Sequence, residues 1–160
     1  MIIAVECYTD EKLVLMLLPE SKDLIRHMYG RGNVINRLRK EITDRAVGLI
    51  DEDPRSAHSR DFINNYIETE SIGAIKRFQH KEKAVCSIVM LCPRIEEWFI
   101  YKAKSIGIQL ADFKLPEDGE VLHSIIHYER NENFNEFLTK LLTSDDEEIN
   151  KLRKWLMGDN

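Results

Sequence analysis

No apolar run in the chain approaches the length of about 20 residues that a membrane-spanning helix needs. The chain also lacks a basic segment before its first apolar stretch, so we expect no signal peptide, no membrane partner and a cytoplasmic location. Cysteines are few, and the three present, Cys7, Cys86 and Cys92, form no short-spaced pair. An odd number without paired spacing argues against a disulfide framework and against a zinc knuckle. We therefore expect all three to pack as small apolar residues.

A basic excess is missing as well. The chain has 28 acidic and 23 basic residues, which gives a formal net charge of −5 at pH 7. Proteins that hold nucleic acid through bulk charge are usually strongly basic, so a nucleic-acid contact here has to be local or mediated by a metal ion. The length of 160 residues predicts one domain. We expect its core over about residues 1–105 and a helical C-terminal extension over about residues 106–160.

Short apolar segments alternate with amphipathic ones along much of the chain. Residues 2–5 and 46–50 are almost wholly apolar and lack the alternation of a half-exposed strand. Such strands are typical of a parallel sheet that is covered on both faces. We therefore predict an α/β fold with a compact, mostly parallel sheet, helices on both faces and additional C-terminal helices. Further strands are expected at residues 23–29, 72–78 and 84–91, and helices at about residues 10–18, 33–45, 62–67, 95–103, 121–128 and, as one or two helices, 134–157.

Carboxylates follow two of the predicted strands directly. Glu6 ends the first, and Asp51 and Asp53 follow the segment 46–50. Ligands of parallel α/β sheets bind beyond the carboxyl ends of the strands, so these acids are expected to meet at one edge. Carboxylates packed together repel one another unless a positive charge lies among them. Magnesium, which prefers oxygen ligands, suits such a place, and the pattern predicts a divalent-metal site.

Two of these segments resemble the signature motifs of Toprim domains. Residues 5–11 (Val-Glu-Cys-Tyr-Thr-Asp-Glu) are similar to the family's strand that ends in glutamate, and residues 48–53 (Gly-Leu-Ile-Asp-Glu-Asp) to its later strand that ends in Asp-x-Asp. Residues 92–98 (Cys-Pro-Arg-Ile-Glu-Glu-Trp) are similar to a Pro-x-x-Glu-x-Trp stretch in small Toprim-like proteins of phage defence. The chain departs from the family at Cys7, where glycine is usual, and a side chain there can narrow the site.

The resemblance covers about the first 100 residues and implies a Toprim-like fold with an active site. It implies that Glu6 acts as general acid/base or metal ligand, and that Asp51 and Asp53 hold Mg²⁺ or Mn²⁺. Asp10, together with Glu96 or Glu97, would hold a second ion in the two-metal manner. The small stand-alone members, the OLD-type nucleases and the RNase M5-like enzymes are the branch that the motifs resemble. The expected reaction is Mg²⁺-dependent hydrolysis or transfer of a phosphodiester in nucleic acid, in a nuclease of phage defence.

Other polar positions have two interpretations each. His123 and His127 have a spacing that can chelate metal, but the glutamate of a zinc-protease motif is missing, which favours surface histidines. Gly30 to Asn33 is either a plain strand-to-helix turn or an anion-binding loop in which Arg31 holds a phosphate. The most basic stretch, at residues 76–83, is either a solvated hairpin or a local nucleic-acid contact through Lys81.

Two rival interpretations stay open at this point. In the first, the Toprim-like fold is retained without catalysis, and the C-terminal helices mediate dimerisation or docking of a partner protein. The apolar residues available for this are Leu138, Leu141, Leu142, Ile149, Leu152, Trp155 and Leu156. In the second, the chain is a receiver-like doubly wound domain, which is disfavoured because receivers cluster their acids directly after the first strand.

Overall fold

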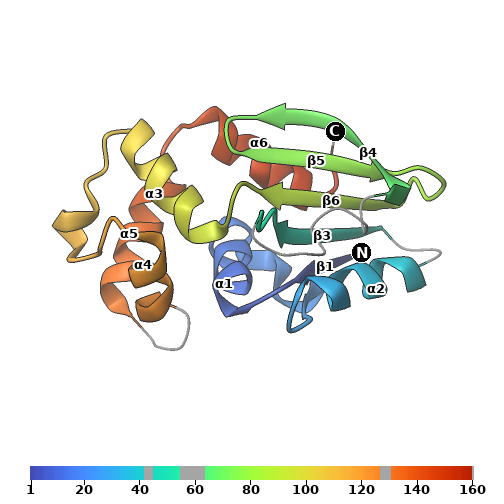
Figure 1. Ribbon diagram of the computed structural model, residues 1–160, viewed down its shortest axis with the longest axis horizontal. Coiled ribbons are helices and arrows are strands. Elements are labelled where there is room, and N and C mark those ends of the chain that lie inside the picture. Colours follow the sequence, from blue (N-terminus) through green and yellow to red (C-terminus); the bar gives the residue numbers. More distant parts are fainter. Residues whose placement is uncertain (42–44, 55–63, 127–130, 160) are drawn as a thin grey trace.

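The computed structural model describes residues 1–41, 45–54, 64–126 and 131–159. Within these ranges one sheet has the strand order β2-β1-β3-β6-β5-β4 (Figure 1). The pairs β2–β1, β1–β3 and β3–β6 are parallel, and β5 and β4 complete the sheet as an antiparallel hairpin. The predicted α/β class with a mostly parallel sheet is therefore confirmed. The strands are β1 (Ile2–Val5), β2 (Ile25–His27), β3 (Ala46–Asp51), β4 (Tyr66–Ile72), β5 (Ile75–His80) and β6 (Cys86–Leu91).

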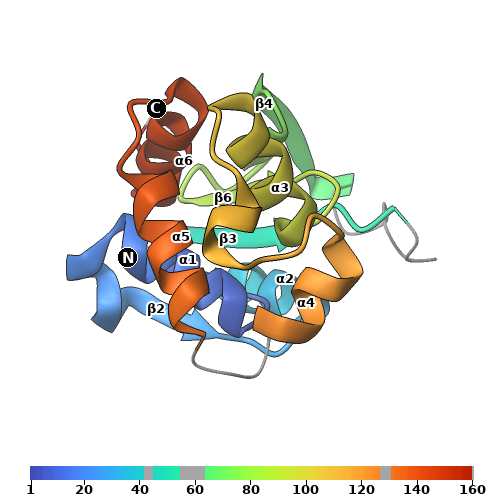
Figure 2. The ribbon, with the colours of Figure 1, turned by 90° about the vertical axis from the view of Figure 1, so that its left-hand side faces the viewer.

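Helices cover both faces of this sheet, as predicted. On one face, α2 packs its apolar side over the first strands, and on the other face α1, α3, α5 and α6 enclose the larger part of the core. Figure 1 shows α3, α4 and α5 grouped at the end of the molecule towards which β3 and β6 point, and Figure 2 shows the same group from that end. The helices are α1 (Tyr8–Leu17), α2 (Arg31–Lys40), α3 (Ile95–Ser105), α4 (Gly119–Ile126), α5 (Glu132–Leu142) and α6 (Glu147–Leu156), with 3₁₀ turns at Pro19–Leu24 and Leu110–Phe113.

The central strands are buried because their residues are apolar on both sides. All four residues of β1 and all six of β6 are buried, and only the last residue of β3, Asp51, is not fully so. Gly48 lets α2 approach this layer, since a Cβ there would lie 2.8 Å from Cγ1 of Val34. The apolar runs of the sequence thus become the strands whose ends carry the acids.

The sequence pattern missed strand β4 and its hairpin with β5. The helix expected at residues 62–67 is wrong in the part that the structure describes, because β4 begins at Tyr66, while residues 62 and 63 lie outside the described residues. The strand expected at 72–78 is interrupted at Gly73, whose φ of +55° makes the hairpin turn. Carboxyl oxygen Oε2 of Glu148 would lie 2.2 Å from a Cβ at this position. A glycine at a positive φ fits both demands.

Glu148, on α6, links this turn to α6 and to α3. Its Oε1 accepts hydrogen bonds from the N–H of Ala74 at 3.0 Å and from Nε1 of Trp98 at 2.8 Å. Its Oε2 lies 2.6 Å from Nζ of Lys102, which also pairs with Asp146 at 3.0 Å. Glu148 is 3% exposed, so a buried carboxylate joins α6, α3 and the hairpin turn. No helix within the described ranges is long and apolar enough to cross a membrane.

Candidate metal centre

Four acidic side chains gather beyond the carboxyl ends of the parallel strands. Glu6 follows β1, Asp10 lies in the first turn of α1, Asp51 ends β3, and Glu96 lies in the first turn of α3, which follows β6. Oε1 of Glu6 accepts a hydrogen bond of 3.0 Å from the N–H of Asp51, across 45 residues of sequence. The sheet topology thus brings Glu6 and Asp51 together. We call Glu6, Asp10, Asp51 and Glu96 the acid cluster.

Burial and mutual repulsion raise the pKa values in the acid cluster. Burial, followed by the charge of Glu6, raises the pKa of Asp10 to about 7. The pKa of Asp51 is raised well above its ordinary value by burial and by the charges of Asp10, Glu6 and Glu96. Burial also raises the pKa of Glu6, against the opposing effects of the Asp51 N–H and the charge of Arg31. The cluster is therefore short of positive charge.

Two carboxyl oxygens of the cluster have no partner among the described residues. Oδ2 of Asp10 accepts hydrogen bonds from the N–H groups of Glu6 and Cys7, at 3.1 and 3.0 Å, whereas its Oδ1 is buried without a partner. Oδ1 of Asp51 is buried without a partner in the same way. Buried polar atoms are nearly always satisfied by a donor or a cation. Unpartnered carboxyl oxygens from two elements fit a hard, oxygen-binding cation such as Mg²⁺.

The cluster is not a ready-made coordination shell. Among the residues that the structure describes, no three His, Cys, Asp or Glu side chains are arranged to hold an ion together. Oε1 of Glu6 is turned to the main chain of Asp51, and Asp10 is turned to its own helix start. Binding of an ion would therefore require these side chains to rotate towards it.

Asp53 and Glu97 lie at the margin of the cluster or outside it. Asp53 has a φ of +40°, its N–H donates to the carbonyl of Pro93, and its charge makes only a small contribution to the pKa of Glu6. Glu97 pairs with Arg94, which also contacts Glu120 at 3.0 Å. The structure therefore brings Asp53 near the cluster but holds Glu97 in a different ion pair.

Cys7 is accommodated without strain at the position where the Toprim pattern has glycine. Its φ of −140° is extended backbone that any residue adopts. Its N–H donates a hydrogen bond to Oδ2 of Asp10 in the first turn of α1. Burial and the charge of Asp10 raise the pKa of the Cys7 thiol. In the metal-free protein this holds the thiol in its protonated, weakly nucleophilic form.

The two predicted phosphate contacts lie at opposite ends of the sheet. Nη1 of Arg31 donates to the carbonyls of Asp51 and Glu52, at 3.4 and 3.1 Å, so this cation borders the acid cluster. Lys81 follows the end of β5, which runs antiparallel to β6. Its side chain donates to the carbonyl of Asn64 at 2.7 Å. The antiparallel direction carries Lys81 to the far edge, and the structure does not bring it to the acids.

His123 is a neighbour of the cluster that sequence reasoning missed. Its Nδ1 lies 2.7 Å from Oε1 of Glu96, because α4 packs against α3. The sequence suggested only the pair His123 and His127, and His127 lies outside the described residues. No sequence signal links His123 to Glu96, since their contact depends on how two helices pack. The Pro-x-x-Glu-x-Trp stretch did indicate Glu96 itself.

An exposed aromatic stack borders the cluster. The ring of His27 is stacked on Tyr29 at 4.2 Å and meets Tyr8 edge-on at 4.2 Å. Tyr8 and Tyr29 are 55% and 71% exposed, which is unusual for large aromatic side chains. Tyr8 begins α1 two residues after Glu6, and Gly30, which follows Tyr29, donates its N–H to the carbonyl of Glu6 at 3.0 Å. Tyr29 has a φ of +57°, a strained conformation for a residue with a side chain.

Comparison of the chain with protein-family models, with curated proteins and with solved structures finds no match. The Toprim resemblance therefore rests on the motifs at residues 5–11, 48–53 and 92–98.

Proposed function

We propose that the acid cluster binds Mg²⁺ or Mn²⁺ and that the protein hydrolyses or transfers a phosphodiester in nucleic acid, with a Toprim-like active site. The observation that carries this proposal is the pair of buried, unpartnered carboxyl oxygens of Asp10 and Asp51 among four mutually repelling acids. A bound divalent cation supplies charge neutralisation at a phosphoryl oxygen and a more acidic water.

Residues of the chain provide the metal ligands, the group that exchanges a proton and a contact for the phosphate. Asp10 and Asp51 are the proposed ligands, and His123 orients Glu96 through their 2.7 Å contact. Glu6 is oriented by the N–H of Asp51 and has a raised pKa, which suits a group that exchanges a proton with water or a leaving oxygen. Arg31 is positioned beside the cluster to contact a phosphate.

The aromatic stack supports nucleic acid with unpaired bases as the substrate. A chain with a net charge of −5 is a poor match for the dense charge of a duplex. Exposed rings beside a basic side chain instead offer surfaces on which bases of a single strand stack. Tyr8 and Tyr29 provide such surfaces next to the acids, and the His27 ring packs against both.

A non-catalytic role through the C-terminal helices finds less support. The apolar side chains that such docking would use are buried in the protein's own core: Leu138, Leu141, Leu142, Ile149, Leu152, Trp155 and Leu156.

The proposal is tested by titrating Mg²⁺ and Mn²⁺ into the wild type and into an Asp51→Ala/Asp53→Ala double variant. Binding is followed by calorimetry, and cleavage of single-stranded DNA and of RNA is assayed in parallel, with nicking of plasmid DNA as the duplex comparison. We expect the wild type to bind and cleave, and the double variant to lose both by at least about a hundredfold. Equally poor metal binding by both proteins would overturn the proposal. An Asp112→Asn variant, altered at an exposed acid away from the cluster, is expected to behave as the wild type.

The aromatic stack gives a separate prediction. A Tyr8→Ala/Tyr29→Ala variant should bind a fluorescently labelled single-stranded oligonucleotide at least about tenfold more weakly, because each lost base–ring contact removes roughly 1–3 kcal/mol. Fluorescence anisotropy without divalent metal measures binding in the absence of cleavage. Tyr101, 46% exposed on α3, provides the matched control Tyr101→Ala, for which no change is expected. Binding that is tighter for a duplex than for the single strand would contradict the prediction.

A further inference from the structure

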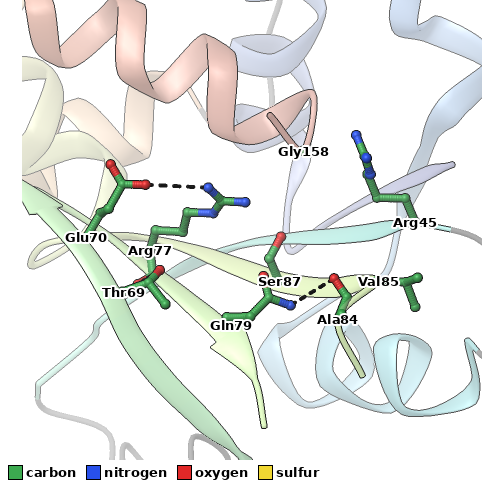
Figure 3. Close-up of a pocket in the computed structure, with 9 residues that line it drawn as sticks. All are labelled: Arg45, Thr69, Glu70, Arg77, Gln79, Ala84, Val85, Ser87 and Gly158. Atoms are coloured by element: carbon green, nitrogen blue, oxygen red, sulfur yellow. Dashed lines mark hydrogen bonds and ion pairs between the residues drawn. The ribbon is translucent and has the colours of Figure 1, made fainter. Parts of the chain in front are cut away.

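A polar cavity of about 480 Å³ lies at the edge of the sheet opposite the acid cluster. It is bordered by β4 and β5, by the starts of β3 and β6 and by Gly158 just beyond α6 (Figure 3). Its volume falls within the roughly 300–1,000 Å³ of small-molecule sites. The side chains that matter for its chemistry are those of Arg45, Glu70, Arg77, Gln79 and Ser87.

Arg77 is the buried cation of this cavity. It belongs to the stretch expected to be a solvated hairpin, yet it is only 5% exposed. The alternation of β5 turns Arg77 to the same face as Ile75, under the end of α6. Nη1 contacts the carbonyl of Asp159 at 3.2 Å and Oε1 of Glu70 at 3.5 Å. Nε is buried without a partner among the described residues. A guanidinium has five N–H donors, and in Arg77 at least the Nε–H lacks an acceptor.

The acids around the cavity do not balance its cations. Oε2 of Glu70 lies 2.7 Å from Nζ of Lys151, closer than Glu70 lies to Arg77. The hydrogen bond from Lys151 is also the main reason for the lowered pKa of Glu70. Arg45 and Asp159 form a long, exposed pair at 3.7 Å. Among the described residues, Arg45, Arg77 and Lys151 thus share the carboxylates of Glu70 and Asp159. A buried charge that is poorly paired is costly.

The end of α6 keeps the cavity open above Arg45. Gly158 has a φ of +74° and ends the helix by donating its N–H to the carbonyl of Trp155. A Cβ at this position would lie 2.3 Å from Cδ of Arg45. Ser87 also lines the cavity and lies between Arg77 and Arg45 in the view of Figure 3. The glycine thus leaves room for the second guanidinium, opposite the first.

We propose that this cavity binds the oxyanion group of a small molecule, a phosphate or a carboxylate, between the guanidinium groups of Arg77 and Arg45 with the hydroxyl of Ser87 as a further donor. An oxyanion supplies the missing negative charge and the acceptors that Arg77 lacks. Planar guanidinium groups suit the paired oxygens of both anions. The site is separate from the acid cluster and does not depend on its function.

The test is calorimetric titration of the wild type with inorganic phosphate, with adenosine 5′-monophosphate and with succinate, at matched ionic strength. We expect saturable binding in the millimolar range or tighter for at least one probe. Tighter binding of the two phosphates identifies a phosphate site, and tighter binding of succinate a carboxylate site. Arg77→Met and Arg45→Gln should each weaken binding by about tenfold or more. Arg26→Gln, altered at an exposed arginine outside the cavity, should leave it unchanged.

A second variant keeps the proposal testable if Arg77→Met fails to fold. Ser87→Val removes one donor without removing a charge, and its circular dichroism is expected to match that of the wild type. It should still weaken binding several-fold. The proposal is overturned if none of the probes binds saturably, or if binding survives both Arg45→Gln and Ser87→Val unchanged. The Asp51→Ala/Asp53→Ala variant should retain anion binding, which separates this site from the acid cluster.

Discussion

Replacing Glu148 with alanine is expected to lower the free energy of unfolding by about 3–5 kcal/mol, the usual cost of removing one partner from a buried ion pair. The carboxylate is 3% exposed and accepts hydrogen bonds from Ala74 and Trp98 while it neutralises Lys102. Its loss leaves the buried indole N–H of Trp98, the N–H of Ala74 and part of the Lys102 ammonium charge without a partner. Urea unfolding followed by tryptophan fluorescence measures the change.

Two controls show whether this effect belongs to the network. Glu147→Ala changes the exposed neighbour on the same helix and should alter the stability by less than about 0.5 kcal/mol. Combined replacement of Glu148 and Lys102 by leucine should cost less than the sum of the single changes, because neither charge is then left alone. A loss below about 1 kcal/mol for Glu148→Ala would show that the network is not needed for stability.

The second large effect concerns pH and the acid cluster. Burial and the charge of Glu6 raise the pKa of Asp10 to about 7, against about 3.9 in an unfolded chain. Between these values the folded state holds a proton that the unfolded state has released. The free energy of unfolding is therefore expected to fall as pH rises from about 4 to about 7, and to stay low above it. Urea unfolding at a series of pH values without divalent metal measures this decline.

Asp10→Asn should remove much of the decline. The amide oxygen can still accept from the N–H groups of Glu6 and Cys7, and no charge remains to be buried. We expect a gain of about 2–4 kcal/mol at about pH 8 relative to the wild type. Mg²⁺ should stabilise the wild type at this pH and have less effect on Asp10→Asn, because binding to the folded state alone raises stability. Asp112→Asn, at an exposed acid, should follow the wild type, and a pH-independent wild type would contradict the prediction.

The strand ends could be predicted because they depend on local patterns. Apolar runs that stop at Glu6 and at Asp51 indicate buried parallel strands, and the edge rule then places their acids together. Asp10 follows from the same motif, and Glu96 from the Pro-x-x-Glu-x-Trp stretch. Each of these residues lies within a few positions of a strand end, so its place in the fold depends little on tertiary packing.

The remaining features depend on packing, which leaves no local signal. His123 reaches Glu96 only because α4 lies on α3, and Arg77 is buried only because α6 covers its side of β5. Lys81 was expected near a phosphate, but its position depends on the direction of β5, which a hairpin at Gly73 reverses. The basic stretch therefore contains both a buried arginine, Arg77, and an exposed lysine, Lys81.

The attachment of α6 also sets the order in which the chain can fold. Glu148 bonds to Ala74 across 74 residues, and Arg153 donates to the carbonyl of Leu17 across 136 residues. Contacts of such separation form slowly, because a long loop must close before they contribute. During synthesis, the N–H groups of Ala74 and Trp98 can pair with Glu148 only after α6 has left the ribosome. Until then the N-terminal strands have an incomplete core, and chaperones that bind exposed apolar surface should recognise chains that end before α6.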